Sequence, residues 1–90
     1  HRAMNMRDCK RLKPGAMVRE SYEGYDQETL GMVLHKEYIE EEHYAKVLGG
    51  KKQKRYDLYV HWFRASPFRI KKGNPCKVQC WEVMLTKNGE

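Results

Sequence analysis

Alternating apolar and polar positions divide the chain into short segments that are typical of half-buried β-strands. Residues 56–63 show this alternation most clearly, because Leu58, Val60 and Trp62 fall on one face of the predicted strand. Aromatic and β-branched side chains dominate the segment, as is usual for a strand. The other segments predicted as strands are residues 16–22, 29–39, 68–70 and 77–86.

The last predicted strand has two faces of similar apolar character. Trp81, Val83 and Leu85 on one face alternate with Val78, Cys80 and Met84 on the other. The face of Trp81 carries the larger apolar area, yet either face could be the inner one. A core that buries Trp81 together with Trp62 is therefore one of two alternatives.

Glycine and proline mark the turns between the predicted strands. Lys13-Pro14-Gly15 predicts a tight turn, because proline fixes its own φ and glycine accepts a positive φ. Gly31 lies inside the second strand, where we expect a bulge or a close backbone approach. Residues 38–48 are open between a helix and a long acidic loop, and the loop is favoured because eleven residues are few for a helix without packing.

Short strands separated by turns predict an all-β fold, either a barrel or a sandwich. A barrel is favoured, because closing the sheet removes its exposed edges. The 90 residues are expected to form one domain. We expect a flexible basic arm over residues 1–11, interpreted as partly vector-derived, the barrel over residues 12–87, and a polar tail over residues 88–90.

Charge is distributed unevenly along the chain. The net charge is +6, with basic residues concentrated in positions 1–20 and 49–90 and acidic residues in positions 21–48. Folding is expected to separate these regions and to create an oriented field. The positive net charge favours a polyanionic partner without establishing one. No run approaches the roughly 20 apolar residues that a membrane-spanning helix needs, so no membrane partner is expected.

The cysteines bear on the compartment and on metal binding. Three cysteines are an odd number, and no segment has the pattern of a secretory signal peptide, so we expect reduced thiols and a cytoplasmic location. The spacing Cys76-x-x-x-Cys80 raises a zinc site as an alternative, but no second ligand pair lies at a matching spacing. We expect no metal and no cofactor, and the role of Cys76 and Cys80 stays open between thiols and ligands.

Catalytic patterns are missing from the sequence. It contains no nucleophile elbow, no glycine-rich phosphate loop and no HExxH motif. His61 lies in an aromatic strand without a catalytic partner, and the run Glu40-Glu41-Glu42 is typical of a solvated loop. The protein is therefore expected to be no enzyme and to act by binding.

Four short motifs follow one another along the chain. They are Lys13-Pro14-Gly15 with Val18, Gly31 with Val33, Val60 with Trp62, and Trp81 with Leu85. In these motifs the chain resembles the SH3-like small barrels of the Tudor, chromo-barrel and KOW groups, and most closely short uncharacterised proteins of tailed phages such as cyanophages. The resemblance implies an SH3-like barrel of about five strands with a long acidic excursion between strands two and three, a phage origin, and a location in the host-cell cytoplasm. It implies no single activity, because small barrels host many unrelated binding functions.

Basic and aromatic residues are interleaved in two stretches of the chain. This composition is typical of modules that bind single-stranded nucleic acid, with cations on phosphates and rings stacked on bases. The residues predicted to bind nucleic acid are Lys51, Lys52, Lys54, Arg55, Tyr59, Phe68, Arg69, Lys71 and Lys72.

A protein-interaction or self-assembling structural module is the alternative. Small barrels bind peptides in aromatic-lined grooves, and the acidic residues 37–42 are suited to a basic partner or to the basic surface of a second copy. Binding to a polyanion that weakens steeply with salt favours the nucleic-acid hypothesis. A mass that rises with protein concentration favours self-assembly.

Overall fold

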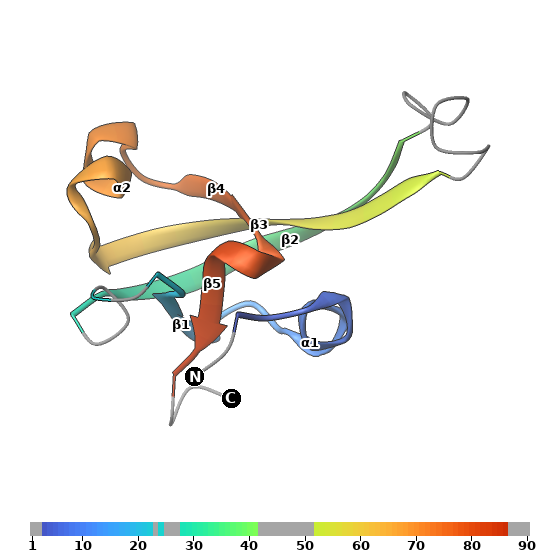
Figure 1. The fold of residues 1–90 in the computed structure, drawn as a ribbon, viewed down its shortest axis with the longest axis horizontal. Coiled ribbons are helices and arrows are strands. Elements are labelled where there is room, and N and C mark those ends of the chain that lie inside the picture. Colours follow the sequence, from blue (N-terminus) through green and yellow to red (C-terminus); the bar gives the residue numbers. More distant parts are fainter. Residues whose placement is uncertain (1–2, 23, 25–27, 42–51, 87–90) are drawn as a thin grey trace.

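A five-stranded antiparallel sheet forms the body of the molecule in the computed structural model, which describes residues 3–22, 24, 28–41 and 52–86 (Figure 1). The order of strands in the sheet is β4-β3-β2-β1-β5. The elements are α1 (Met6–Arg11), β1 (Met17–Glu20), β2 (Leu30–Glu41), β3 (Gln53–Arg64), α2 (Pro67–Lys72), β4 (Cys76–Gln79), the 3₁₀-helix η1 (Cys80–Glu82) and β5 (Val83–Leu85).

The all-β prediction is confirmed, with five strands paired antiparallel. β1 to β4 are neighbours in chain order, and β5 returns to pair with β1. The sheet is not closed, because β4 and β5 end it on opposite sides. The predicted strand at residues 56–63 is confirmed within β3, and Leu58, Val60 and Trp62 are buried as its pattern indicates.

Gly31 brings β2 close to β3, as the sequence predicts. The register shifts between Leu30 and Gly31, which marks a bulge. A Cβ atom on Gly31 would lie 2.6 Å from Cγ1 of Val60 and 2.7 Å from Cε3 of Trp62. Only glycine therefore fits between these two core side chains.

The turn predicted at Lys13-Pro14-Gly15 is also confirmed. The backbone N–H of Ala16 donates to the carbonyl of Lys13 at 3.1 Å, and Gly15 has a φ of 94°. A positive φ at the third residue of such a turn favours glycine. The N–H of Gly15 then donates to the carbonyl of Val33 at 2.7 Å, which fastens the turn to β2.

The prediction of a flexible arm over residues 1–11 is wrong for the residues that form α1. Asn5 and Asp8 cap this helix reciprocally, with Asp8 N–H donating to Asn5 Oδ1 at 2.9 Å and Asn5 N–H donating to Asp8 Oδ2 at 3.1 Å. Cys9 of the helix is fully buried and forms a disulfide with Cys80. The expectation of reduced thiols is therefore corrected for this pair, and Cys76 is the free cysteine.

The strand predicted at residues 68–70 is wrong, because this segment is helix α2. Ser66 occupies the N-cap position, and Pro67 follows at the start of the helix. Proline is favoured there, since its fixed φ suits the helix and the first N–H groups need no partner within it. Apolar residues at positions 68 and 70 are exposed on α2 and do not alternate across a sheet.

The last predicted strand is divided into β4, η1 and β5. The backbone N–H of Gln79 donates to the carboxylate of Glu82 at 2.6 Å, which closes the 3₁₀ turn between the two strands. The turn directs Trp81 outward, where it is 60% exposed, while Val78, Cys80 and Val83 are buried. The alternative that buries Trp81 is therefore wrong.

The acidic excursion predicted from residue 38 begins later than expected. β2 continues to Glu41 and stays paired with β3, with Tyr38 opposite Tyr56 and Glu40 opposite Lys54. Opposite charges and aromatic pairs across an antiparallel ladder stabilise it, so the hairpin extends past the core. Residues 42–48 lie outside the described residues.

Candidate functional site

Arg69 is removed from the predicted nucleic-acid site by its burial. Its guanidinium is 0% exposed and pairs with Glu20 (Nε to Oε1, 3.1 Å) and Glu82 (Nη2 to Oε1, 2.9 Å). Desolvation lowers the pKa of Arg69, but the hydrogen bond and charge of Glu82 and the hydrogen bond of Glu20 outweigh it, so the pKa is raised overall. Arg69 is a charged group of the interior, and the prediction that it contacts phosphate is wrong.

Ion pairs within the β2–β3 hairpin engage two more of the predicted cations. Arg55 lies 2.8 Å from Glu41 (Nη1 to Oε2) and 3.1 Å from Asp57 (Nε to Oδ1), and hydrogen bonds to these carboxylates raise its pKa. Lys52 lies 3.9 Å from Glu40 (Nζ to Oε2). These carboxylates neutralise part of the positive charge of both side chains, so less of that charge is available to a phosphate ligand. Lys51 lies outside the described residues.

Tyr59 and Phe68, the two predicted stacking residues, lie on different surfaces. Tyr59 points away from the core, since its neighbours Leu58 and Val60 are fully buried, and its ring lies 5.6 Å from that of His35. Phe68 is 57% exposed on α2, with Nζ of Lys72 4.6 Å from the centre of its ring. Lys71 and Lys72 are exposed beside it.

The predicted residues therefore do not form one site. Lys54 lies near the start of β3, whereas α2 follows its end at Arg64. Ten residue steps of strand at about 3.3 Å each separate these positions by about 33 Å. Figure 1 shows α2 beside one end of β3 and the outer part of the hairpin at the other.

A different basic and aromatic surface lies between α1 and the inner face of the β2–β3 hairpin. It is a groove of about 860 Å³, lined by Met6, Arg7, Lys10, Arg11, Tyr38 and Tyr56. Arg7, Lys10 and Arg11 are spaced i, i+3 and i+4, so they share one face of α1. We call these six residues the α1 groove.

Two tyrosines form the wall of the α1 groove that faces the helix. Tyr38 and Tyr56 are cross-strand partners with ring centroids 5.2 Å apart. Tyr38 is 45% exposed, and its hydroxyl donates to Oε1 of Glu40 at 3.1 Å. Desolvation, followed by the hydrogen bond and charge of Glu40, raises the pKa of Tyr38, so the ring stays neutral at physiological pH.

Lys36 fixes the helix against this wall. Its ammonium donates to the carbonyl of Cys9 at 3.0 Å and to that of Lys10 at 2.6 Å, which satisfies carbonyls at the helix C-terminus. The same ammonium lies 5.4 Å from the centre of the Tyr56 ring. Together with the Cys9–Cys80 disulfide, these contacts hold the two sides of the groove in place.

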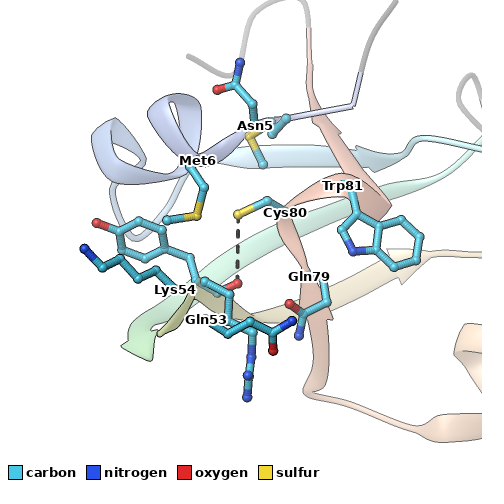
Figure 2. A pocket seen from close by; sticks show the side chains of 10 residues that line it. Asn5, Met6, Gln53, Lys54, Gln79, Cys80 and Trp81 are labelled. Atoms are coloured by element: carbon cyan, nitrogen blue, oxygen red, sulfur yellow. Dashed lines mark hydrogen bonds between the residues drawn. The ribbon is translucent and has the colours of Figure 1, made fainter. Parts of the chain in front are cut away.

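A smaller pocket adjoins the α1 groove and shares Met6 and Tyr56 with it. Its volume is about 330 Å³, and its other lining residues are Met4, Asn5, Gln53, Lys54, Arg55, Gln79, Cys80 and Trp81. Figure 2 shows Met6 and Trp81 on either side of Cys80, with Gln53 and Lys54 across the opening. Lys54 and Arg55 are the predicted cations that line this pocket. We call it the Trp81 pocket.

The sequence does not predict the α1 groove when residues 1–11 are interpreted as an arm. Two local signals could have revealed the helix. The spacing Asn5-x-x-Asp8 fits a capping box, and Arg7, Lys10 and Arg11 follow helical spacing. The proximity of Tyr38 to these cations had no local signal, since it depends on how α1 packs on the sheet.

A zinc site at Cys76 and Cys80 is not available in this structure, because Cys80 is bonded to Cys9. Within the described part of the chain, no three His, Cys, Asp or Glu side chains are placed to hold a metal ion. No helix of the described residues is both long and apolar enough to cross a membrane.

Comparisons with protein-family models, with curated proteins and with solved structures give no match to this chain.

Proposed function

We propose that this protein is a non-enzymatic binding module that takes single-stranded nucleic acid into the α1 groove. The observation that carries the proposal is the gathering of Arg7, Lys10 and Arg11 on one helix face opposite a tyrosine pair, in which Tyr38 is exposed and Tyr56 is partly buried. Cations that track a backbone beside rings that stack on bases are the two elements of single-strand recognition.

The three cations of α1 have no carboxylate to neutralise them among the residues described. Asp8, the acid of this helix, turns back to cap Asn5. Like charges at these spacings destabilise a helix by about a few tenths of a kcal/mol per pair, which offsets part of the favourable interaction of Lys10 and Arg11 with the helix C-terminus. A phosphate backbone lying along the groove supplies the missing counter-charge.

The tyrosine wall favours a single strand over a duplex. Tyr38 offers an exposed ring face, and a base reaches such a face only when it is unstacked from its neighbours. Glu40 accepts from the hydroxyl of Tyr38 at its edge, which leaves the ring face uncovered by that contact. The bases of a duplex are paired and stacked, so a duplex can contact the cations of α1 but cannot stack a base on the Tyr38 ring.

The fold proposed for the module is an SH3-like small barrel in an open form. The return of β5 to β1 and the tight approach at Gly31 support this assignment. The phage origin implied by the sequence motifs belongs to the same proposal, whereas the Cys9–Cys80 disulfide is unusual for the host-cell cytoplasm that the motifs also imply. Small barrels of this kind serve as scaffolds whose ligands are set by their grooves.

The predicted patch on α2 is kept as the competing site for the same ligand. Phe68, Lys71 and Lys72 combine an exposed ring with two cations. It differs from the α1 groove in that its ring and its cations come from one helix, whereas the groove combines a helix with two strands.

A second candidate function is self-association through the outer face of the sheet. Leu34 of β2 and Phe63 of β3 are exposed, and the ring centroids of His61 and Phe63 lie 5.0 Å apart in an edge-on arrangement. Exposed apolar side chains are suited to contact with a second copy. Light scattering of the protein without nucleic acid, over a range of concentrations, distinguishes this function. The measured mass rises with concentration if the protein self-associates, and it stays constant if the protein only binds nucleic acid.

The proposal is tested by fluorescence anisotropy with short mixed-sequence single strands and the matching duplex, from about 50 to about 200 mM salt. The triple variant with Arg7→Ala, Lys10→Ala and Arg11→Ala should flatten the plot of log affinity against log salt by about 2, at roughly 0.7 per phosphate contact. Alanine favours helix, so α1 should remain folded.

The matched control removes the same charge elsewhere, with Lys71→Ala, Lys72→Ala and Lys77→Ala. These side chains are exposed on α2 and β4. We expect this control to keep nearly the wild-type slope and the preference for single strands. Equal losses in both variants, or a loss in the control alone, would contradict the α1 groove as the binding site.

A further inference from the structure

Among the described residues, no strand pairs with the main chain of β3 at the position of Lys54 on the β4 edge. In an antiparallel strand, alternate residues direct their N–H and C=O groups to the same edge. At one end of β3, the N–H of Trp62 donates to Asn74 Oδ1 at 2.8 Å and its carbonyl accepts from Asn74 Nδ2 at 3.0 Å. Trp62 therefore points its main-chain groups toward the β4 edge, and so does every second residue before it.

The contact at Tyr56 agrees with this alternation. Its carbonyl oxygen lies 3.9 Å from Sγ of Cys80, which follows β4 (dashed in Figure 2). The pairing of β3 with β4 runs only from Val60 to Asp57, and the chain then turns away through η1. Lys54 is the next residue of the series, and no strand of the described residues reaches its N–H and C=O on this edge.

The Trp81 pocket opens at this position. Lys54 and Gln53 border it from β3, and Trp81 presents a large exposed ring from η1 (Figure 2). Met6 and Tyr56 line both this pocket and the α1 groove, so the two adjoin. A volume of about 330 Å³ is at the small end of the range for ligand pockets, roughly 300 to 1,000 Å³.

We propose that the Trp81 pocket holds one unstacked base of the strand that lies in the α1 groove. This inference rests on the proposed function and adds a base-recognition site to it. The free N–H and C=O of Lys54 form an adjacent donor and acceptor, which match the alternating donors and acceptors on the edge of a nucleobase. The Gln53 amide adds a second donor and acceptor, and the Trp81 indole provides the stacking face.

The charge around the pocket favours a nucleotide as its occupant. Lys54 and Arg55 line the pocket, and Arg7 lines the adjoining α1 groove. A base in the pocket therefore leaves its phosphates between cations. Backbone-edge contacts of this kind read the base itself and are insensitive to salt, whereas the α1 cations set the salt dependence.

The test compares the wild type with Trp81→Ala on an oligothymidylate, an oligoadenylate and a fully abasic strand of the same length. Trp81 is exposed, so the variant should fold, which circular dichroism checks. We expect Trp81→Ala to weaken binding of at least one base-bearing strand by roughly five-fold to a hundred-fold, the usual contribution of one stacked base. The abasic strand should bind both proteins equally, and the salt slope should stay unchanged.

Phe68→Ala is the matched control, since it removes another exposed ring from a different surface. It should leave all three affinities unchanged. Gln53→Ala provides a second variant of the pocket, with a smaller loss on the base-bearing strand. Equal effects of Trp81→Ala on abasic and base-bearing strands would overturn the base pocket.

The two proposals fail in different ways. If the Arg7, Lys10 and Arg11 variant loses binding while Trp81→Ala and Gln53→Ala bind like the wild type, the α1 groove stands and the base pocket is wrong. If no single strand binds at about 50 mM salt, both proposals are overturned.

Discussion

Arg69 and Glu20 form an ion pair from which solvent is fully excluded, with both side chains 0% exposed and 3.1 Å between Nε and Oε1. The Glu20 carboxylate also accepts from the N–H and hydroxyl of Ser66, at 2.6 Å and 2.9 Å. β1 and the start of α2 are thus joined through one carboxylate. A buried carboxylate with several donors is tolerated because its desolvation is offset by charge and hydrogen bonds.

Replacing Arg69 with methionine should destabilise the fold by about 3 to 5 kcal/mol, because Glu20 is then left buried without its cation. The double variant Glu20→Gln with Arg69→Met should recover part of this loss, since the uncompensated charge is gone. Urea unfolding followed by circular dichroism measures both. A near-neutral effect of Arg69→Met would mean that this arginine is solvated.

The two tryptophans should respond differently to the same substitution. Trp62 is 3% exposed and packs on Gly31, so Trp62→Ala should cost about 3 to 5 kcal/mol. Trp81 is 60% exposed, so Trp81→Ala should change stability by less than about 1 kcal/mol. Thermal unfolding of the pair checks the orientation of η1, and similar losses in both variants would contradict it.

A single methyl group at Gly31 should disturb the core. The added Cβ of Gly31→Ala would meet Val60 and Trp62 at separations well inside van der Waals contact, and both belong to β3. Overpacking of this kind costs about 1 to 3 kcal/mol, and more where neighbours are rigid. We expect a lower midpoint in urea. An unchanged midpoint would show that β2 and β3 are further apart here.

The Cys9–Cys80 disulfide should be detectable in the purified protein. Its formation removes two hydrogens, so the mass should be about 2 Da below that of the reduced chain. Cys76 is free and buried, so one thiol should react with an alkylating agent, and only after unfolding. Three reactive thiols in the unfolded protein would contradict the pairing.

Reduction of this disulfide should weaken ligand binding as well as stability. The two cysteines are 71 residues apart, and a cross-link over such a loop stabilises by roughly 4 kcal/mol in the chain-entropy description. The variant with Cys9→Ala and Cys80→Ala should therefore unfold at a lower temperature and bind single strands less tightly, because α1 carries the cations of the groove. Cys76→Ala is the control, and an equal loss of affinity in it would contradict the positioning role of the disulfide.

Local patterns predicted the parts of the fold that depend on neighbouring residues. The alternation around Leu58 and Val60, the turn at Gly15 and the close approach at Gly31 all follow from a few adjacent positions. The missed elements depend on distant partners. Arg69 is buried because Glu20, 49 residues away, meets it inside the fold, and nothing next to Arg69 in the sequence signals that charge.

The same reasoning explains the candidate site. Counting cations along the chain selected Arg55 and Lys52, whose neutralising carboxylates lie on the opposite strand of the hairpin. It passed over Arg7 and Lys10, because their aromatic partners lie more than twenty residues away in sequence. The count of charged residues in a sequence predicts that the protein is basic. Which cations remain without a neutralising carboxylate depends on how the strands pair.

The most direct test of the α1 groove is an NMR titration of labelled protein with a short single strand, recorded at low salt. The account predicts that the largest shift changes fall on Arg7, Lys10, Tyr38 and Tyr56, and that they saturate together. Changes confined to Phe68, Lys71 and Lys72, or an unchanged spectrum at saturating oligonucleotide, would contradict it.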